Sequence, residues 1–419
     1  MRRRDFFKTA AAGTMTALIN PAFLHAGEKS DYPPCRAITK GPLFHWGAYY
    51  DQIHFDPTGR FVISNQVNFE GRSPTPEDTI DVGFIDLEEN DRWTKIGSTK
   101  SWNWQQGCML QFIPGDSSEV VWNSRGEEDF FATVYDIKTG EKRILPKPVY
   151  ALAPNGRFSV YPDFRRLNDT RPGYGYCGIP DPNGETLIPE NAGIWKMDLK
   201  TGENGMLFSF ADVARIPHAD GRPFPDGVKH WFNHLIVSPD SERFLFLHRW
   251  KQEPDKMAWN TRLLTAKADG TDIRIVSDND MVSHLVWRDP EHIIAYARNP
   301  LAGDRFYLFN INTGDATVYG KDIMKVDGHV SYLPCTGLRW ILNDTYPNKE
   351  RLQTPFLFNL ETEEKIELGA FYLAPEYKGE WRCDLHPRAS RDGRKVLIDS
   401  AHQDGRQIYL IDLAGLNLD

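Results

Sequence analysis

The sequence has no excess of basic charge, no paired cysteine motif and, beyond its first residues, no long apolar run. Its formal net charge is -9 at pH 7, so bulk attraction to nucleic acid or to anionic lipid is not expected. Five cysteines without CxxC spacing give neither a zinc-ribbon pattern nor a disulfide framework, and buried free thiols are the simpler interpretation. Aromatic residues at 12% and charged residues at 26% are typical of a soluble globular protein.

The N-terminal segment has the pattern of a twin-arginine export signal. The basic stretch RRRDFFK at Arg2 precedes a mildly apolar run that ends at Ala26, where cleavage is expected. A transmembrane anchor is the alternative, but the run is barely of spanning length and contains Thr, Asn and Pro. We therefore expect a periplasmic or secreted protein without a stable membrane anchor. Loss of residues 1–26 removes four basic residues and one acidic residue, which moves the formal charge to -12.

A repeated pattern covers most of the remaining sequence. It consists of an apolar strand, a turn rich in Pro, Asp and Gly, a second strand, and a third strand that often ends in Asp or Asn. The clearest hairpin is NHLIVSPDSERFLFLHRW at residues 233–250, where Pro239 presets φ and Asp240 can bond its own backbone. The third strands recur as VGFIDLEEND at Val82, TVYDIKTGEK at Thr133, IWKMDLKTGE at Ile194, LLTAKADGTD at Leu263, YLFNINTGDA at Tyr307, FLFNLETEEK at Phe356 and IYLIDLAG at Ile408.

Seven such units predict an all-β fold, a seven-bladed β-propeller with four antiparallel strands in each blade, formed by residues 27–419 as a single domain. The hairpin of the first blade is expected to begin at Ile53. The last unit offers only three strands, so residues 35–40 should supply its outer strand and close the ring. The insertion at residues 164–191 is rich in Gly, Pro and Asn and is expected to be a loop rather than a separate small domain.

Histidines recur at one position of this repeat. His234 lies five residues before Pro239, and the same offset from the next three turns gives His284, His329 and His386. Because the first strand of each blade lines the central channel, the four side chains should meet near one mouth. Neutral imidazoles around a shared channel suit a divalent metal, whereas a single histidine could instead bond the backbone of a neighbouring blade.

Aromatic and polar residues should gather around the same mouth, at the ends of second strands and in loops that enter the blades. Exposed Trp offers a flat platform for a sugar ring, while Arg, Gln and Tyr can fix hydroxyl and carboxylate groups. Packing between blades is the alternative role for each Trp. The candidate substrate-binding residues are Tyr50, Trp102, Trp104, Gln106, Arg165 and Trp231.

Several short motifs in blades four to seven mark a family resemblance. They are LHR at residues 247–249 followed by NTR at 260–262, SHLVW at 283–287, GH at 328–329, and HP at 386–387 before the hairpin DGRKVLIDS. Through these motifs the chain resembles oligogalacturonate lyases. The resemblance implies a propeller that cleaves at a uronic acid.

The same resemblance bears on a metal site. In those lyases manganese is held by histidines and a glutamine, which implies His329 and His386 as ligands here, with His284 as a further candidate. Cys383 stands where the glutamine would be and Arg388 where another histidine would be. The metal is therefore either lost or bound with the help of His234 and His284. The candidate cofactor is a divalent ion, Mn or Ca.

The first two blades carry different motifs, HWGAYYD from His45 and WNWQQGCMLQF from Trp102. These are similar to a broader set of exported seven-bladed propellers that process rhamnose-glucuronate caps of plant polysaccharides, some by hydrolysis and some by elimination. The resemblance to the hydrolytic group implies His45 as a catalytic candidate.

Both resemblances point to a uronic acid, and β-elimination is the expected reaction. The sugar carboxylate must be neutralised by a metal or Arg, a base removes the α-proton, and an acid protonates the leaving oxygen. Arg249 is the expected carboxylate clamp or base, His248 and His234 are acid-base partners, and Tyr346 is a proton donor.

Two other functions fit the same sequence. A histidine-dependent glycoside hydrolase would use His45 or a carboxylate such as Asp51 or Asp344. A non-catalytic propeller that binds a glycan or a protein would have the same fold without activity. We expect a monomer whose partner is a uronic-acid-containing oligosaccharide or polysaccharide.

Overall fold

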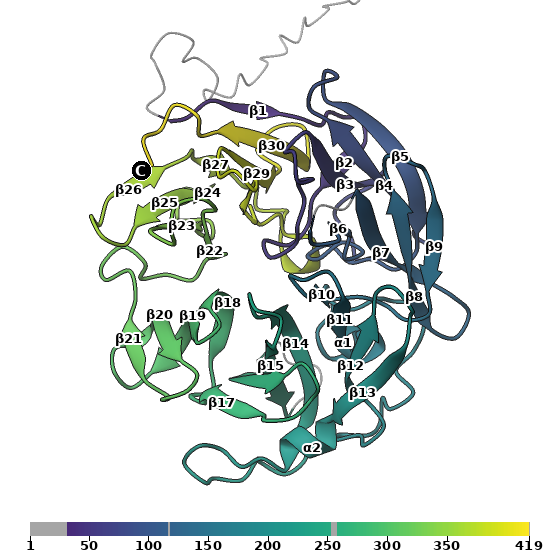
Figure 1. The fold of residues 1–419 in the computed structure, drawn as a ribbon, viewed down its shortest axis with the longest axis vertical. Coiled ribbons are helices and arrows are strands. Elements are labelled where there is room, and N and C mark those ends of the chain that lie inside the picture. Colours follow the sequence, from purple (N-terminus) through teal and green to yellow (C-terminus); the bar gives the residue numbers. More distant parts are fainter. Residues whose placement is uncertain (1–31, 116–117, 253–257, 419) are drawn as a thin grey trace, which may run out of the picture. The chain divides into compact units, whose positions relative to one another are not determined.

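The computed structural model describes residues 32–115, 118–252 and 258–418. Residues 32–419 form one compact unit, in which seven four-stranded antiparallel sheets stand around a common axis (Figure 1). The predicted seven-bladed, all-β fold is confirmed. The predicted export signal at residues 1–26 lies outside the described residues. None of the helices in the described part of the chain is long and apolar enough to cross a membrane.

Each blade runs from an inner strand to an outer strand. The first blade contains β2 Phe44–Trp46, β3 Phe61–Val67, β4 Ile80–Asp86 and β5 Arg92–Thr99, and the second contains β6 Gln111–Phe112, β7 Glu119–Arg125, β8 Phe130–Asp136 and β9 Lys142–Leu145. The third contains β10 Ala151–Leu152, β11 Phe158–Pro162, β12 Gly193–Asp198 and β13 Asn204–Ser209. The fourth contains β14 Lys229–Val237, β15 Arg243–Lys251, β16 Asn260–Lys267 and β17 Arg274–Ser277.

The fifth blade contains β18 Val282–Asp289, β19 His292–Asn299, β20 Gly303–Asn310 and β21 Ala316–Val318. The sixth contains β22 Ser331–Tyr332, β23 Trp340–Asn343, β25 Phe356–Asn359 and β26 Lys365–Glu367. The seventh contains β28 Arg388–Ala389, β29 Lys395–Ser400, β30 Gln407–Asp412 and β1 Cys35–Ala37. A separate two-stranded sheet pairs β24 Leu352–Gln353 with β27 Phe371–Tyr372. Gly379–Trp381 forms a short 3-10 helix.

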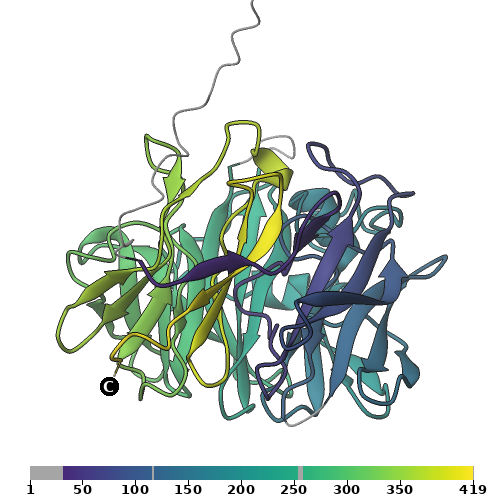
Figure 2. The same cartoon turned by 90° about the horizontal axis from the view of Figure 1, so that it is seen from above.

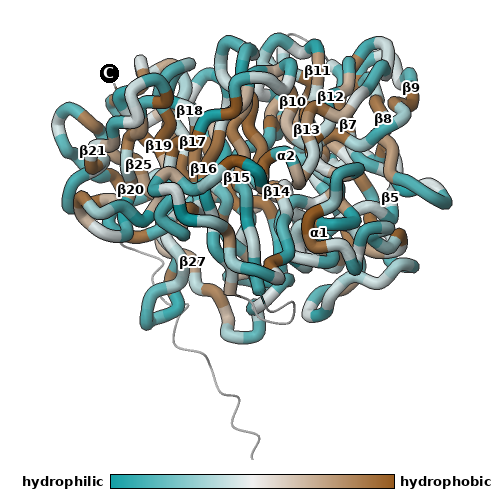
Figure 3. The backbone as a smooth tube through the Cα atoms, turned by 90° about the horizontal axis from the view of Figure 1, so that it is seen from below, coloured by the Kyte–Doolittle hydropathy of each residue, from teal (hydrophilic) through white to brown (hydrophobic). Residues whose placement is uncertain are grey.

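Apolar side chains between neighbouring blades form the core. Phe208 of the third blade lies 6.1 Å from Phe232 and 5.3 Å from Phe246 of the fourth, measured between ring centres. All nine residues of β15 are buried, and its apolar run at residues 244–247 is typical of a strand that is covered on both faces. Hydrophobic residues follow the strands and hydrophilic residues the connecting turns (Figure 3). Burial of each large apolar side chain stabilises the fold by roughly 1.5–3 kcal/mol.

The insertion in the third blade is more ordered than predicted. Residues 164–170 form helix α1 (Phe164–Thr170), which Asp163 caps by accepting a hydrogen bond from the Arg165 backbone. A second short helix, α2 (Phe210–Ala214), begins with a capping box between Ser209 and Asp212. The loop prediction for 164–170 was wrong because the Asp cap, rather than apolar periodicity, starts this helix.

Ring closure follows the prediction. Cys35–Ala37 pairs antiparallel with β30, so the N-terminal strand completes the last blade, and the two strands lie side by side in Figures 1 and 2. The first blade differs from its prediction. Its inner strand is Phe44–Trp46, and near Ile53 only an isolated bridge between Phe55 and Val62 remains.

The chain between these two pieces enters the channel, and we call residues 47–52 the channel segment. Its start is fixed by Asp399, whose carboxylate accepts hydrogen bonds from the backbone of Gly47 (2.9 Å) and Ala48 (3.1 Å). Arg388 binds the same carboxylate at 2.7 Å, and both charged side chains are 2% exposed. A Cβ at Gly47 would lie 2.7 Å from the Arg388 guanidinium, so this close approach requires glycine.

We expect Asp399→Ala to lower the free energy of unfolding by about 3–5 kcal/mol, because it leaves the buried Arg388 charge uncompensated. Urea unfolding measures the change. Asp304→Ala, which breaks an ion pair with the half-exposed Arg298, is the control and should cost less than about 1 kcal/mol. Equal losses in the two variants would contradict the anchoring role of Asp399.

Candidate active site

Four histidines from consecutive blades meet at one mouth of the channel. The ring centres of His284 and His329 are 4.2 Å apart, and those of His329 and His386 are 4.3 Å apart. His234 lies 6.0 Å from His284. The structure thus brings together the four residues that the repeat spacing singled out, and we call them the histidine cluster.

Irregular backbone occurs at three of these histidines. An extra residue interrupts the pairing of β14 with β15 at His234, whose φ is 49°. A similar irregularity between Val282 and Leu285 contains His284, and His386 has a φ of 43°. Bulges redirect side chains, and left-handed backbone at a residue other than glycine costs about 1–3 kcal/mol. Such strain is typical of functional positions.

Carboxylates orient two members of the cluster. Nδ1 of His329 lies 2.9 Å from both carboxylate oxygens of Asp344, and Nδ1 of His284 lies 3.0 Å from Oδ1 of Asp327. An Nδ1–H that donates to a carboxylate leaves Nε2 with a free lone pair. This is the tautomer that a metal ligand or a general base requires.

Burial sets the charge of the cluster. It lowers the pKa values of His234, His284 and His386, so these three imidazoles are neutral at neutral pH. Burial acts in the same direction on His329, but the carboxylate of Asp344 outweighs it and raises the pKa of this histidine.

Three buried groups at this mouth fit a metal ion. His329, Asp384 and His386 each place one ligand atom within 4.8 Å of the others. Nε2 of both histidines and Oδ1 of Asp384 are buried without a hydrogen-bond partner among the described residues. Two imidazole nitrogens and one carboxylate oxygen suit a transition metal better than Ca²⁺, which takes oxygen ligands.

Cys383 and Arg388 stand at the two positions where this sequence departs from the metal ligands that the family resemblance implies. Cys383 is fully buried, and burial raises the pKa of its thiol to about 12, so the thiol keeps its proton as long as no metal binds it. Arg388 is held by Asp399 in the buried ion pair that fixes the channel segment. Asp384, one residue after Cys383, offers the oxygen that the expected glutamine would have supplied.

Tyr49 of the channel segment lies among the four histidines. Its ring centre is 4.8 Å from that of His386 and 5.3 Å from that of His234, and its hydroxyl lies 3.2 Å from Nε2 of His234. Tyr346 completes this side, with its ring centre 5.6 Å from that of His329.

Three guanidinium groups border the cluster. Arg382 donates to Asp384 at 2.6 Å and to the hydroxyl of Tyr174 at 2.9 Å. Arg171 lies over the Tyr174 ring, with Cζ 4.8 Å from the ring centre. Arg249 is 5% exposed, and burial, followed by repulsion from Arg171, lowers its pKa to about 10.

The tyrosines at this mouth have pKa values shifted in opposite directions. Burial raises the pKa values of Tyr49 and Tyr346 well above their usual range, so both keep their protons. Burial would also raise the pKa of Tyr174, but the guanidiniums of Arg382 and Arg171 outweigh it and lower the pKa. Tyr174 is therefore the tyrosine of this group that loses its proton more readily, whereas Tyr49 and Tyr346 stay protonated, and such unequal pKa values are how acid and base roles are separated.

Two predicted catalytic histidines lie elsewhere. His248 points to the other side of β15, where Nδ1 accepts from Arg262 at 3.0 Å and Nε2 lies 2.7 Å from His230. Alternation along the strand explains this, because Arg249 occupies the face toward the channel. His45 lies between Gln407 and Gln66, and none of its described contacts reaches the histidine cluster.

The predicted tryptophan platform is not exposed. Trp102 and Trp104 are each 1% exposed and pack against Trp46, while Trp231 is 0% exposed. The expectation of exposed sugar platforms was wrong for these three residues, because they fill space between blades.

The remaining predicted binding residues serve structural contacts. The Tyr50 hydroxyl bonds both backbone groups of Leu285, at 3.0 and 3.1 Å. Gln106 is fully buried and donates to Tyr150 at 2.7 Å. Arg165 pairs with Asp163 at the start of α1.

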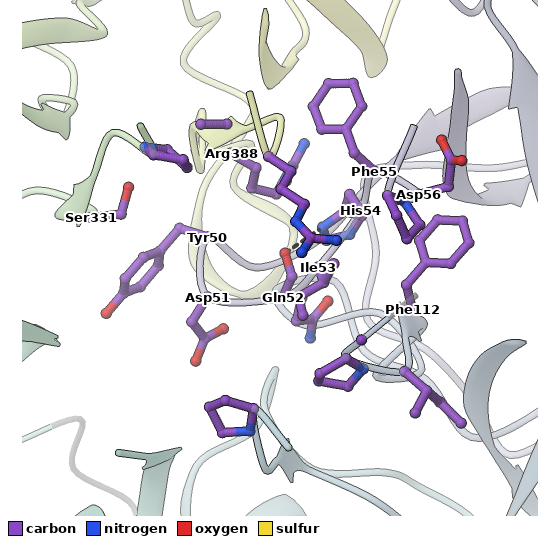
Figure 4. A pocket seen from close by; sticks show the side chains of 18 of the residues that line it. Tyr50, Asp51, Gln52, Ile53, His54, Phe55, Asp56, Phe112, Ser331 and Arg388 are labelled. Atoms are coloured by element: carbon purple, nitrogen blue, oxygen red, sulfur yellow. Dashed lines mark hydrogen bonds between the residues drawn. The ribbon is translucent and has the colours of Figure 1, made fainter. Parts of the chain in front are cut away.

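A cavity of about 440 Å³ opens on the side of the hairpin turns. The channel segment forms part of its wall, with Tyr50, Asp51 and Gln52 side by side and the Asp51 carboxylate turned into the open space (Figure 4). Tyr50 also faces the histidine cluster, 5.4 Å from His329 between ring centres. The channel segment thus separates this cavity from the histidine cluster.

Six residues at the candidate site escaped the sequence analysis: Tyr49, Arg171, Tyr174, Asp327, Arg382 and Asp384. Tyr49 and Asp384 follow or precede residues that were singled out, but no repeat position marks them. Arg171 and Tyr174 belong to the insertion, where Gly and Pro content predicted only a loop. Their arrangement with Arg249 and His234 depends on tertiary contacts, so no local signal in a single sequence could find it.

Two of the solved structures to which this chain is similar are oligogalacturonate lyases. One is an oligogalacturonate lyase from Vibrio parahaemolyticus, with a TM-score of 0.61 and 15% identity over 91% of this chain and 94% of that chain. Another is an oligogalacturonate lyase in complex with manganese, with a TM-score of 0.62 and 16% identity over the same shares of the two chains. No protein-family model and no curated protein matches the sequence. At these identities the likeness establishes the shared fold.

The pH dependence of the free energy of unfolding tests the raised pKa of Asp51. Burial raises the pKa of this carboxyl from 3.8 to about 7, so folding takes up a proton between these pH values and wild-type stability falls as pH rises through them. Asp51→Asn does not titrate and should gain stability relative to wild type as pH rises from 4 to 7. Urea unfolding at both ends measures this gain, and Asp404→Asn at an exposed site is the control. A stability difference between Asp51→Asn and wild type that is the same at all pH values would contradict the raised pKa of Asp51.

Proposed function

We propose that this protein is a lyase that cleaves a uronic-acid-containing oligosaccharide or polysaccharide by β-elimination. The observation that carries the proposal is the meeting of Tyr174, whose pKa is lowered, with protonated Tyr49 and Tyr346 beside Arg171, Arg249 and Arg382. β-Elimination next to a carboxylate needs these three elements: a cation for the carboxylate, a base and an acid.

The guanidiniums neutralise the substrate carboxylate. Arg249 is nearly buried and has no ion-pair partner among the described residues, so a sugar carboxylate would gain a strong charge-assisted interaction there. Neutralising this group makes the neighbouring C–H acidic, because negative charge that develops at that carbon spreads into the carboxylate.

Tyrosines then move the protons. Tyr174, with its oxygen held by Arg382, takes the proton from the carbon beside the carboxylate as that C–H bond breaks. The electron pair forms a carbon-carbon double bond while the glycosidic C–O bond on the next carbon breaks. Tyr346 or Tyr49 protonates the leaving oxygen, with His234 within reach of Tyr49 to return the proton. No water is consumed.

The metal candidates fit this function. His329, Asp384 and His386 would hold a divalent ion such as Mn²⁺, and the orphaned Nε2 and Oδ1 atoms carry that assignment. A bound divalent ion supplies Lewis-acid polarisation of a substrate oxygen. Asp344 holds the His329 ring in the ligating orientation.

The hydrolase alternative has less support. It would use His45 or a carboxylate such as Asp51 or Asp344. His45 contacts Gln407 and Gln66, away from the arginines. Asp344 is held by His329, and Asp51 faces the cavity at the turns. The binding-only alternative leaves the opposite pKa shifts of the tyrosines without a purpose.

Activity on oligogalacturonates tests the proposal, with ultraviolet absorbance of the unsaturated product as the readout. We expect Arg249→Gln to lower kcat/KM about 10²- to 10³-fold, the typical loss when one preorganised charge partner is removed. Arg298→Gln, at a surface ion pair of the fifth blade, is the matched control and should leave it unchanged. New reducing ends without an unsaturated product would show hydrolysis and contradict the proposal.

Metal content separates Asp384 from its neighbour Cys383. We expect Asp384→Asn to weaken Mn²⁺ binding by at least about 10-fold, because it removes an anionic ligand, while Cys383→Ala retains the affinity. Metal analysis and titration of the purified protein measure this directly. The reverse order of effects would place the metal on the thiol instead.

A further inference from the structure

Two guanidinium groups share one indole beside the candidate active site. Cζ of Arg171 lies 4.3 Å from the ring centre of Trp259, and Cζ of Arg249 lies 5.5 Å from it. Cation-π contact holds each side chain in place. The two residues come from different parts of the third and fourth blades, so only the folded chain brings them together.

Neither guanidinium has a carboxylate partner among the described residues. Nε of both side chains is buried without a hydrogen-bond partner. Three other buried arginines are paired with carboxylates, Arg166 with Asp181, Arg382 with Asp384, and Arg388 with Asp399. Buried Arg262 instead donates to backbone carbonyls and to His248, so its Nε does have a hydrogen-bond partner. Two unpaired, mutually repelling cations that are largely withdrawn from water cost stability, which indicates that their partners come from a ligand.

The insertion that carries Arg171 is held firmly. Arg171 ends α1, with its backbone N–H donating to Leu167 at 2.7 Å. Tyr176 stacks on Phe164 with ring centres 4.3 Å apart and an interplanar angle of 8°. A Cβ on Gly175 would lie 2.0 Å from the backbone of Asn168, so this segment packs directly on the helix. Arg171 is therefore positioned before any ligand arrives.

We propose that Arg171 and Arg249, held by Trp259, bind the carboxylates of two uronate residues of one saccharide, which makes Arg171 the residue that selects an oligomer over a single uronate. This extends the proposed function and rests on it for the identity of the sugar. Each guanidinium fork binds one carboxylate, and two unneutralised cations call for two anionic groups. Arg382 is already neutralised by Asp384 and is not counted.

Binding experiments on the intact protein test this inference without requiring turnover. The probes are digalacturonate, galacturonate and the dimethyl ester of digalacturonate, measured by calorimetry in a Tyr174→Phe background that slows cleavage. We expect digalacturonate to bind tightest, and Arg171→Gln to weaken it about 10- to 100-fold while the ester changes little, because hydrogen bonds to charged groups carry this much affinity. Arg171→Lys should recover part of the lost affinity for digalacturonate. The control Arg298→Gln should leave that affinity unchanged.

Stability provides a second readout. Arg171→Gln should keep or raise the midpoint of thermal unfolding without ligand, because one of two repelling charges is gone, and should lose most of the upward shift that digalacturonate gives wild type. Equal binding of digalacturonate to Arg171→Gln and wild type would overturn the inference. Galacturonate or the ester binding as tightly as digalacturonate would overturn it too.

The two proposals fail separately. Tight, Arg171-dependent binding of digalacturonate without any unsaturated product in the Tyr174-containing protein would contradict the lyase function and support the two-carboxylate site. Formation of an unsaturated product, together with unchanged digalacturonate binding in Arg171→Gln, would support the lyase function and contradict the two-carboxylate site.

Discussion

The buried carboxylate of Asp399 is the interaction on which the arrangement of the channel depends. It binds Arg388 of its own blade and two backbone N–H groups at the start of the channel segment. Because the partner groups belong to the last and first blades, one buried charge both joins the ends of the ring and turns the chain into the channel. Tyr49 reaches the histidine cluster only because Gly47 and Ala48 are held there.

Electrostatics then divides similar side chains into different roles. Equivalent histidines differ in charge preference because the carboxylate of Asp344 raises the pKa of His329, whereas burial, followed by repulsion from neighbouring His and Arg side chains, lowers that of His386. Three tyrosines differ because two guanidiniums adjoin Tyr174, whereas Tyr49 and Tyr346 are dominated by burial. The fold creates these differences by placing loops of unequal composition over equivalent blade positions.

The candidate site also shows how a repeat fold acquires specificity. The blades supply symmetric positions, and the histidine cluster occupies four of them. The parts that break the symmetry come from outside the repeat: the channel segment, the insertion with Arg171 and Tyr174, and the short 3-10 helix that precedes Arg382. The unpaired charges of Arg171 and Arg249 are tolerated in the absence of ligand because the large core between blades stabilises the ring.

The sequence by itself determined the propeller, its closing strand and the four histidines, because these follow from local turn chemistry and a fixed offset in a repeat. Residues 35–40 were expected to complete the last blade, and Cys35–Ala37 does so because a final unit with three strands leaves one open edge. Tertiary structure alone decided which neighbouring side chains face the channel. His248 and Arg249 differ by one position, so alternation along β15 puts them on opposite faces, and the register of β15 with β14 decides that Arg249 has the face toward the site. The three tryptophans were expected at the surface, but the space between blades decided their burial. Arg171, Tyr174 and Asp384 joined the site through contacts between distant segments, and the electrostatic effects that distinguish them act through space rather than along the sequence.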